Sequence, residues 1–241
     1  MEWCLLPPTL AFALVAVVCT FNCLVNATTD PNQARTLNAI FSKWGIKANP
    51  DHWNISGDLC SGRAIDDTLF ADRTYNPFIK CDCFKDSENS TCHITKLKVY
   101  ALSVVGEIPE ELWTLTNLTE LDIRQNHLTG SLPPAIGKLT RMEYLSFGIN
   151  ALSGEIPKEL GNLIELKSLS FASNNFSGSL PSQLGNLLKL EQLYIGSSGV
   201  SGPIPTTFEN LKNLKTVWAN DVELTGRIPD FIGNWSNLNS L

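Results

Sequence analysis

The sequence predicts an α/β solenoid in which short coils stack along a single axis. From Cys92 onward a motif recurs every 24 residues without insertion, with Gly at positions 106, 130, 154, 178, 202 and 226 and Pro three residues after each. Within each unit two apolar residues are separated by one polar residue, as at Leu121 and Ile123, which indicates a short strand. One unit alone has too little apolar surface to offset the entropy of ordering its backbone, so each coil must stack on its neighbours.

The first 27 residues are predicted to be a secretory signal peptide. An apolar stretch from Leu10 to Val25 is too short for a comfortable bilayer span, and small side chains precede a cleavage point after Ala27. Glu2 stands where such peptides usually carry Lys or Arg, which leaves an uncleaved anchor as the alternative. The rest of the chain has no apolar run of 18 residues, so we expect it to enter the secretory pathway without a membrane span of its own.

Four cysteines remain after that cleavage, and an even set in an oxidising compartment usually forms disulfides. Of the three possible connectivities we favour Cys60 with Cys81 and Cys83 with Cys92, on the premise that Cys81 and Cys83 project from opposite sides of an extended strand. The competing interpretation is a zinc site in which three of these thiolates join His93, although the paired CxxC spacing of zinc knuckles is absent.

Sequons for N-glycosylation also point to export. One, at Asn26, would leave with the signal peptide. The candidate glycosylation sites of the mature chain are Asn54, Asn89, Asn117, Asn175 and Asn234.

Composition and charge exclude several classes of function. The chain is 43% apolar and 17% charged with a formal net charge of -6, so it lacks the basic surface that binds nucleic acid. His52, His93 and His127 are scattered, with no nucleophile and base at a catalytic spacing. We therefore expect neither an enzyme nor a site for a metal or another cofactor.

Residues 28–92 are predicted to cap the open end of the solenoid. Asp30 followed by Pro31 is typical of a helix start, and the residues after them place apolar side chains on one helical face. That face should cover the first coil, because otherwise Ile94 and Leu97 would contact water. The residues of the face are Ala34, Leu37, Ile40, Phe41 and Trp44.

One position of the repeat, which forms a column when the coils stack, holds a polar residue at a point where the chain turns inward. Asn126, Asn150 and Asn174 occupy it, and a buried amide there can bond backbone groups of its own coil and of the adjacent one. The column is broken by Leu102 before this run and by Ser198 and Val222 after it. We expect a ladder of amide bonds through the middle coils and looser coils at both ends.

The register LxxLxxLxLxxNxLxGxIPxxLGx resembles the plant-specific leucine-rich repeat, over about six units in residues 93–241 with the last one truncated. The preceding segment, with NISGDLC and YNPFIKCDC, resembles the amino-terminal cap of plant leucine-rich repeat receptor-like serine/threonine kinases, above all the group with a malectin-like domain after the repeats. This resemblance implies a right-handed superhelix with a parallel, concave β-sheet and a disulfide-stapled cap. It also implies a membrane span and a kinase in full-length members. No kinase motif occurs in this chain, so we interpret it as a truncated N-terminal ectodomain.

Binding is the remaining candidate for function. On the concave face the strands should present two outward columns, and in these Tyr194, Trp218 and Asn220 form what we expect to be a flat aromatic patch with amide edges, which Arg124 and Tyr144 extend. Such a patch suits an extracellular peptide, a glycan or a co-receptor protein. Tolerated surface aromatics are the plainer interpretation. The columns run Lys98, Asp122, Ser146, Ser170, Tyr194, Trp218 and Tyr100, Arg124, Gly148, Ala172, Gly196, Asn220.

The leading hypothesis is thus the extracellular ligand- or co-receptor-binding part of a plant receptor-like kinase, held at the plasma membrane through downstream segments. The alternative is a free secreted leucine-rich repeat inhibitor of a cell-wall-degrading enzyme. The carboxyl end argues against the alternative, because we expect it to leave apolar residues uncovered and prone to association. These residues are Ile228, Ile232, Trp235 and Leu238.

Overall fold

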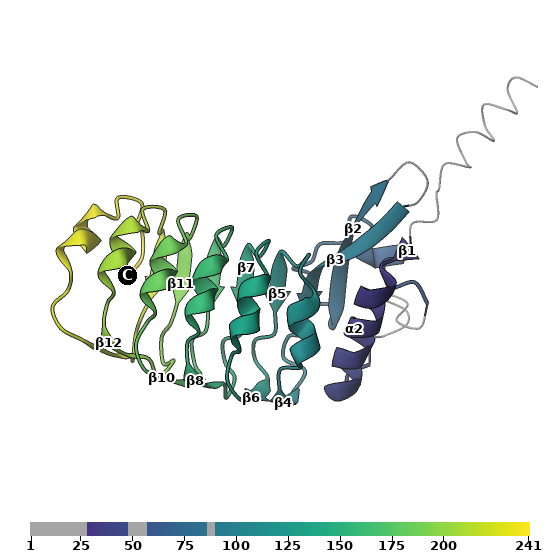
Figure 1. Cartoon of the computed structure of the whole chain (residues 1–241), viewed down its shortest axis with the longest axis horizontal. Helices are drawn as coiled ribbons and strands as arrows, with labels where there is room; N and C mark the ends of the chain where they lie inside the picture. The colour runs from purple at the N-terminus through teal and green to yellow at the C-terminus, as the bar shows by residue number, and fades with distance from the viewer. Residues whose placement is uncertain (1–27, 48–56, 86–89) are drawn as a thin grey trace, which may run out of the picture.

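The computed structural model describes residues 28–47, 57–85 and 90–241. Figure 1 shows the repeats as a row of stacked coils that begins at helix α2 and continues to the carboxyl end. The predicted signal peptide and the sequons at Asn54 and Asn89 lie outside the described residues. In the described part, no helix is both long enough and apolar enough to span a membrane.

The main sheet contains eight strands among the described residues, and the repeats add one parallel strand per coil. The order is β1-β3-β5-β7-β9-β11-β13, with β2 pairing β3 in antiparallel fashion. The central residues of the repeat strands, including Leu121, Leu145 and Leu169, are register partners and are buried in one interior row. The strands are β1 (Thr28–Thr29), β2 (Phe78–Lys85), β3 (Ser90–Lys98), β5 (Glu120–Asp122), β7 (Tyr144–Ser146), β9 (Ser168–Ser170), β11 (Gln192–Tyr194) and β13 (Thr216–Trp218).

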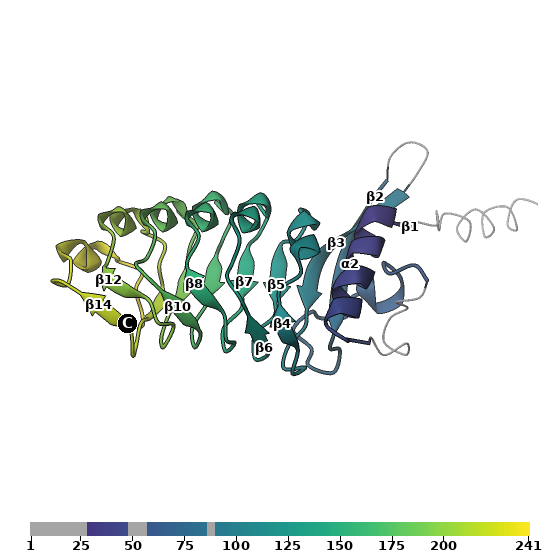
Figure 2. The ribbon, with the colours of Figure 1, turned by 60° about the horizontal axis from the view of Figure 1, so that its bottom comes forward.

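Each coil then passes through a second short strand and a 3-10 helix, which lies across the core from the main sheet (Figure 2). Prolines occupy the N-cap positions of the repeat 3-10 helices, and the glycine of each GxIP or GxLP segment has a positive φ, as at Gly130 with 82°. The second strands are β4 (Val105–Glu107), β6 (His127–Thr129), β8 (Ser153–Glu155), β10 (Asn175–Ser177), β12 (Ser201–Pro203) and β14 (Glu223–Thr225). The 3-10 helices are η1 (Gly62–Ala64) in the cap and η2 (Glu110–Thr114), η3 (Pro134–Lys138), η4 (Lys158–Asn162), η5 (Ser182–Asn186), η6 (Thr206–Asn210) and η7 (Asp230–Asn234) in the repeats.

The cap forms as its sequence predicts. Helix α2 (Pro31–Lys43) starts after Asp30, whose carboxylate accepts hydrogen bonds from the backbone amides of Asn32 and Gln33. Its apolar face, including Leu37 and Ile40, is buried and packs beside η2 of the first coil. This helix therefore closes the amino-terminal end of the core.

The disulfide connectivity is confirmed, although the premise behind it is wrong. Cys60 is bonded to Cys81 and Cys83 to Cys92. Residues two apart on a regular strand project from the same side, so sidedness cannot separate Cys81 from Cys83. The antiparallel register decides the second pair, because β2 places Cys83 directly opposite Cys92 on β3.

The asparagine ladder is also confirmed. The Asn150 side-chain amide donates to the carbonyl oxygens of Ile123 at 3.1 Å and Phe147 at 3.0 Å and accepts from the backbone amide of Leu128 at 3.0 Å. Asn174 repeats this pattern one coil later. Ser198 replaces asparagine at the end of the column. There the backbone amide of Phe176 donates to the backbone carbonyl of Ser198, which replaces one of the bonds that an asparagine side chain makes in the preceding coils.

Close packing between the 3-10 helices depends on a glycine in each of η3, η4 and η5. A β-carbon added to Gly161 would lie 2.3 Å from the carbonyl oxygen of Gln183 in the next coil. From η3 to η6 the helices pack closely, whereas η7 is splayed from η6, in which Glu209 holds the glycine position (Figure 1). The small residue thus sets how tightly adjacent coils approach.

The carboxyl end only partly matches the expected apolar surface. Trp235 is buried, and its indole nitrogen donates to the carbonyl oxygen of Phe208. The prediction of an exposed Trp235 is therefore wrong, because the side chain folds back over the preceding coil. Ile228 is 81% exposed, while Ile232 and Leu238 are partly buried.

Candidate ligand-binding surface

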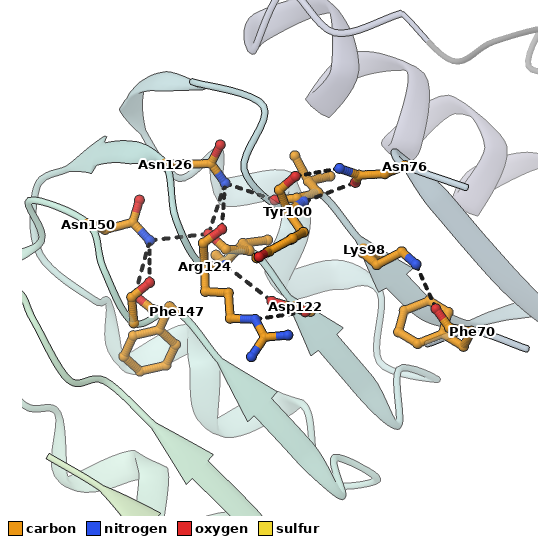
Figure 3. Close-up of polar contacts among 12 residues, drawn as sticks. Phe70, Asn76, Lys98, Tyr100, Asp122, Arg124, Asn126, Phe147 and Asn150 are labelled. Carbon is orange, nitrogen blue, oxygen red and sulfur yellow. Dashed lines mark hydrogen bonds and ion pairs between the residues drawn. The ribbon is translucent and has the colours of Figure 1, made fainter. Parts of the chain in front are cut away.

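The exposed face of the main sheet is formed by the first and third residues of each short strand and by the residue two positions further on. The sequence predicts Lys98 as an exposed residue of this face; it lies on the face beside its register partner Asp122, but the expected exposure is wrong. Lys98 is buried, with its ammonium group donating at 2.6 Å to the carbonyl oxygens of Phe70 and Asp72 (Figure 3). A loop of the cap therefore covers the face at β3, and the open surface begins at β5.

A hollow of about 320 Å³ lies on this face between β5 and β13. We call it the aromatic hollow. Four of the five predicted binding residues line it together: Arg124, Tyr194, Trp218 and Asn220. Tyr144 is exposed on β7 but does not line the hollow; its ring instead lies 5.9 Å from the ammonium nitrogen of Lys167.

Two aromatic rings form one end of the aromatic hollow. Tyr194 and Trp218 are direct register partners on β11 and β13, and their ring centroids are 5.6 Å apart. The rings meet at 78°, so the flat patch that the sequence predicts is an edge-to-face pair. This arrangement places the positive edge of one ring against the negative face of the other. Trp218 is 56% exposed and presents apolar surface to a ligand.

The floor of the aromatic hollow consists of small residues. Gly148, Ala172 and Gly196 follow one another at 24-residue intervals, so no large side chain fills the space above the backbone. A β-carbon at Gly196 would lie 2.3 Å from Asn220 Oδ1, which shows how closely the amide of Asn220 approaches the bare backbone. Three serines supply hydroxyl groups to the wall: Ser170, Ser173 and Ser197.

Arg124 closes the other end, where neighbouring groups hold its guanidinium (Figure 3). Its Nε lies 3.2 Å from a carboxylate oxygen of Asp122, and its guanidinium carbon lies 5.0 Å from the ring centroid of Tyr100. Burial raises the pKa of the Asp122 carboxyl above its ordinary value, and the Arg124 guanidinium opposes that rise. The ion pair occupies Nε and leaves the terminal nitrogens of the guanidinium available to a ligand.

Arg124 also borders a second hollow of about 250 Å³, formed where the cap meets the sheet. Asn76 supports this junction by accepting a hydrogen bond from the Tyr100 amide and donating to the Tyr100 carbonyl. Burial lowers the pKa of the Lys98 ammonium here. Sequence reasoning missed this hollow, because no repeat pattern places the loop around Phe70 and Asn76 against β3.

Charges elsewhere along the strands are paired between adjacent coils. Lys96 contacts Glu120 at 2.9 Å, and Lys215 contacts Glu191 at 2.7 Å, each pair being 24 residues apart. The ion pair of Glu143 with Lys167 follows the same rule. The residues that line the aromatic hollow include no carboxylate, so its interior is uncharged except at Arg124.

Comparison with known proteins agrees with this architecture. The family model described as Leucine Rich Repeat matches residues 117–139 and 165–187. The chain has the leucine-rich repeat fold. It is 61% identical over 95 residues to a probable LRR receptor-like serine/threonine-protein kinase of Arabidopsis thaliana, a match that covers 39% of this chain and 9% of the relative. The chain thus spans a small part of the length of that relative.

Solved leucine-rich repeat structures extend the likeness. The LRR ectodomain of the receptor kinase SOBIR1 from Arabidopsis thaliana aligns over 83% of this chain and 100% of its own, with a TM-score of 0.64 and 23% identity, which supports the fold. The Arabidopsis receptor kinase HAESA, in complex with the peptide hormone IDA and the co-receptor SERK1, aligns over 61% of this chain and 29% of its own, with a TM-score of 0.50 and 30% identity. The chain is therefore structurally similar to receptor-kinase ectodomains.

Proposed function

We propose that this chain is the extracellular recognition part of a plant receptor-like kinase and that the aromatic hollow is its ligand-binding surface. The observation that carries the proposal is the hollow itself, in which an aromatic pair with an exposed Trp218, a floor of small residues and an anchored arginine meet on the open face of a leucine-rich repeat sheet. Sites that bind small ligands combine apolar walls with a few placed polar groups in this way.

An extracellular peptide, a glycan or a co-receptor protein are the proposed partners. The complex of HAESA with a peptide hormone and SERK1 supports the peptide and co-receptor classes. The hydroxyl and amide groups beside Trp218 also suit a neutral sugar. A free inhibitor of a cell-wall-degrading enzyme is less well supported, because the likeness is to receptor kinases.

The whole protein is proposed to belong to the group with a malectin-like domain after the repeats, to be held at the plasma membrane and to carry its kinase downstream. The resemblance of the cap segment supports this assignment. Asn117, Asn175 and Asn234 are the described candidate glycosylation sites, and Asn175 and Asn234 are exposed. A transcript encoding a malectin-like domain, a membrane span and a kinase after residue 241 would support the assignment, and a soluble inhibitor expressed alone would oppose it.

The binding proposal is tested with the immobilised chain and three probes: a phage library of random dodecapeptides, an array of cell-wall oligosaccharides and the SERK1 ectodomain. Binding is compared between the unaltered chain, Tyr194→Ala and Trp218→Ala. Ile164→Ala is the matched control, because Ile164 is an exposed apolar residue outside the aromatic hollow.

We expect at least one probe to bind, with affinity falling about tenfold or more for each aromatic variant, as for the loss of an aromatic anchor. Ile164→Ala should bind as the unaltered chain does. Unchanged affinity in Tyr194→Ala and Trp218→Ala would remove the aromatic hollow from the account, and failure of all three probes would remove the proposed function.

A further inference from the structure

One apolar residue on the aromatic hollow occupies a backbone conformation that does not suit it. Ile149 follows β7 with a φ of 57°, in the left-handed region. Side chains branched at the β-carbon are strained there, because the branch crowds the backbone. The same position in other coils holds residues without that branch, namely Gln125, Ser173, Ser197 and Asp221, all with φ between 51° and 57°.

The core does not account for this choice. Ile149 is 50% exposed, whereas the apolar columns of the repeat are buried. The coil also obtains its backbone bonds without help from the side chain: the Ile149 amide donates to the carbonyl of Ala172, and the Ile149 carbonyl accepts from the amide of Asn126. A polar residue that tolerates positive φ would make the same two bonds, so neither the backbone bonds nor a buried apolar column explains the isoleucine.

Its surroundings supply a reason. Ile149 lines the aromatic hollow together with Tyr194 and Trp218. It lies three coils before Trp218 in the stack, so strands spaced by about 4.8 Å separate these two coils by roughly 14 Å. Between them the floor is the small-residue row of Gly148, Ala172 and Gly196. Two apolar contact points thus lie on either side of a floor of small residues.

We propose that Ile149 is a specificity-determining contact that holds an apolar group of the ligand near the Arg124 end of the aromatic hollow. The proposal rests on the proposed function of the hollow. The ligand is accordingly an extended molecule with apolar groups roughly 10 to 14 Å apart, one against Ile149 and one against the Tyr194–Trp218 pair. The backbone strain at Ile149 is then retained because this side chain contacts the ligand.

The test uses indole as an apolar probe in a nitrogen-15 NMR titration of the full chain with both disulfides formed. Indole should shift the amide signals of Ile149 and Ser173 in a saturable way. It should also shift signals around Phe208 and Trp235, where a separate, wholly apolar hollow of about 60 Å³ gives an internal control.

Ile149→Asn should abolish the shifts at position 149 and its neighbour while leaving those near Trp235 intact. Ile149→Val keeps a branched apolar side chain and should retain both sets. Gln125→Asn is the matched control, because it changes the equivalent left-handed position outside the aromatic hollow.

Thermal unfolding supplies a second measurement. Ile149→Asn should raise the melting temperature by about 2 to 4 °C, as expected when a strain near 1 kcal/mol is relieved in a chain of this size. A lower melting temperature would show that the isoleucine supports the coil and would overturn the proposal. So would indole shifts that persist at position 149 in Ile149→Asn, or that never occur there in the unaltered chain. If the chain binds indole at Ile149 but binds none of the three larger probes, the contact at Ile149 is supported and the proposed function is rejected.

Discussion

Replacing Asn126 with alanine tests the asparagine ladder where it is most deeply buried. The Asn126 side chain accepts from the backbone amides of Leu102 at 3.0 Å and Val104 at 3.1 Å. It donates to the carbonyl oxygens of Val99 at 2.8 Å and Ile123 at 3.0 Å (Figure 3). The alanine side chain can make none of these bonds, and the backbone groups that lose them lie where water has little access.

The expected cost follows from those four bonds. A typical buried hydrogen bond contributes about 1 kcal/mol net, so Asn126→Ala should lower the free energy of unfolding by roughly 4 kcal/mol. Ser198→Ala is the matched control at the same column. Ser198 Oγ is buried and bonds no group within the described part of the chain, so its removal should change stability by less than about 1 kcal/mol or increase it.

Urea unfolding followed by circular dichroism measures both variants. The free energy of unfolding should fall strongly for Asn126→Ala and hardly at all for Ser198→Ala. Equal losses in the two variants would refute the claim that the amide ladder, and not the mere filling of this column, stabilises the turns.

Three further predictions concern packing, titration and dynamics. Gly161→Ala should destabilise the fold by about 1 to 3 kcal/mol, because the new β-carbon meets the Gln183 carbonyl, whereas Gly233→Ala, with nothing within 4 Å, should be tolerated; calorimetry that ranks them equally would contradict the packing argument. Because burial raises the pKa of Asp122 in the folded chain above its value in the unfolded chain, stability falls as the pH rises from the unfolded pKa to the folded pKa. Asp122→Asn should therefore gain stability relative to the unaltered chain as urea-unfolding measurements move from pH 4 to pH 7, and a constant difference would oppose this. Amides of residues 227–241 should exchange hydrogen faster than those of the third coil, since Ile228 is exposed and η7 is splayed; equal protection would contradict this.

The sequence was sufficient for the parts of the fold that repeat. A spacing of 24 residues fixes which side chains share a row, so the register of Leu121 with Leu145 and the ladder of Asn126 and Asn150 follow from counting alone. The cap helix was equally readable, because Asp30 and an apolar face of fixed period are local signals.

Contacts outside the repeat could not be read in this way. The loop that buries Lys98 belongs to the cap and has no periodic register with β3. The edge-to-face angle of Tyr194 and Trp218 depends on rotamers, which spacing does not determine. Ile149 was missed because its significance is a backbone angle, although a β-branched residue in a column that otherwise holds small or polar residues was a visible signal.

The central claim is that the chain recognises its ligand on the aromatic hollow. Hydrogen–deuterium exchange with a binder from the peptide, oligosaccharide or SERK1 experiments tests it most directly. Exchange should slow in the segments that follow β7, β9 and β11, around Ile149, Ser173 and Ser197, and should not change at the 3-10 helices. A footprint confined to the 3-10 helices or to residues 227–241 would contradict it.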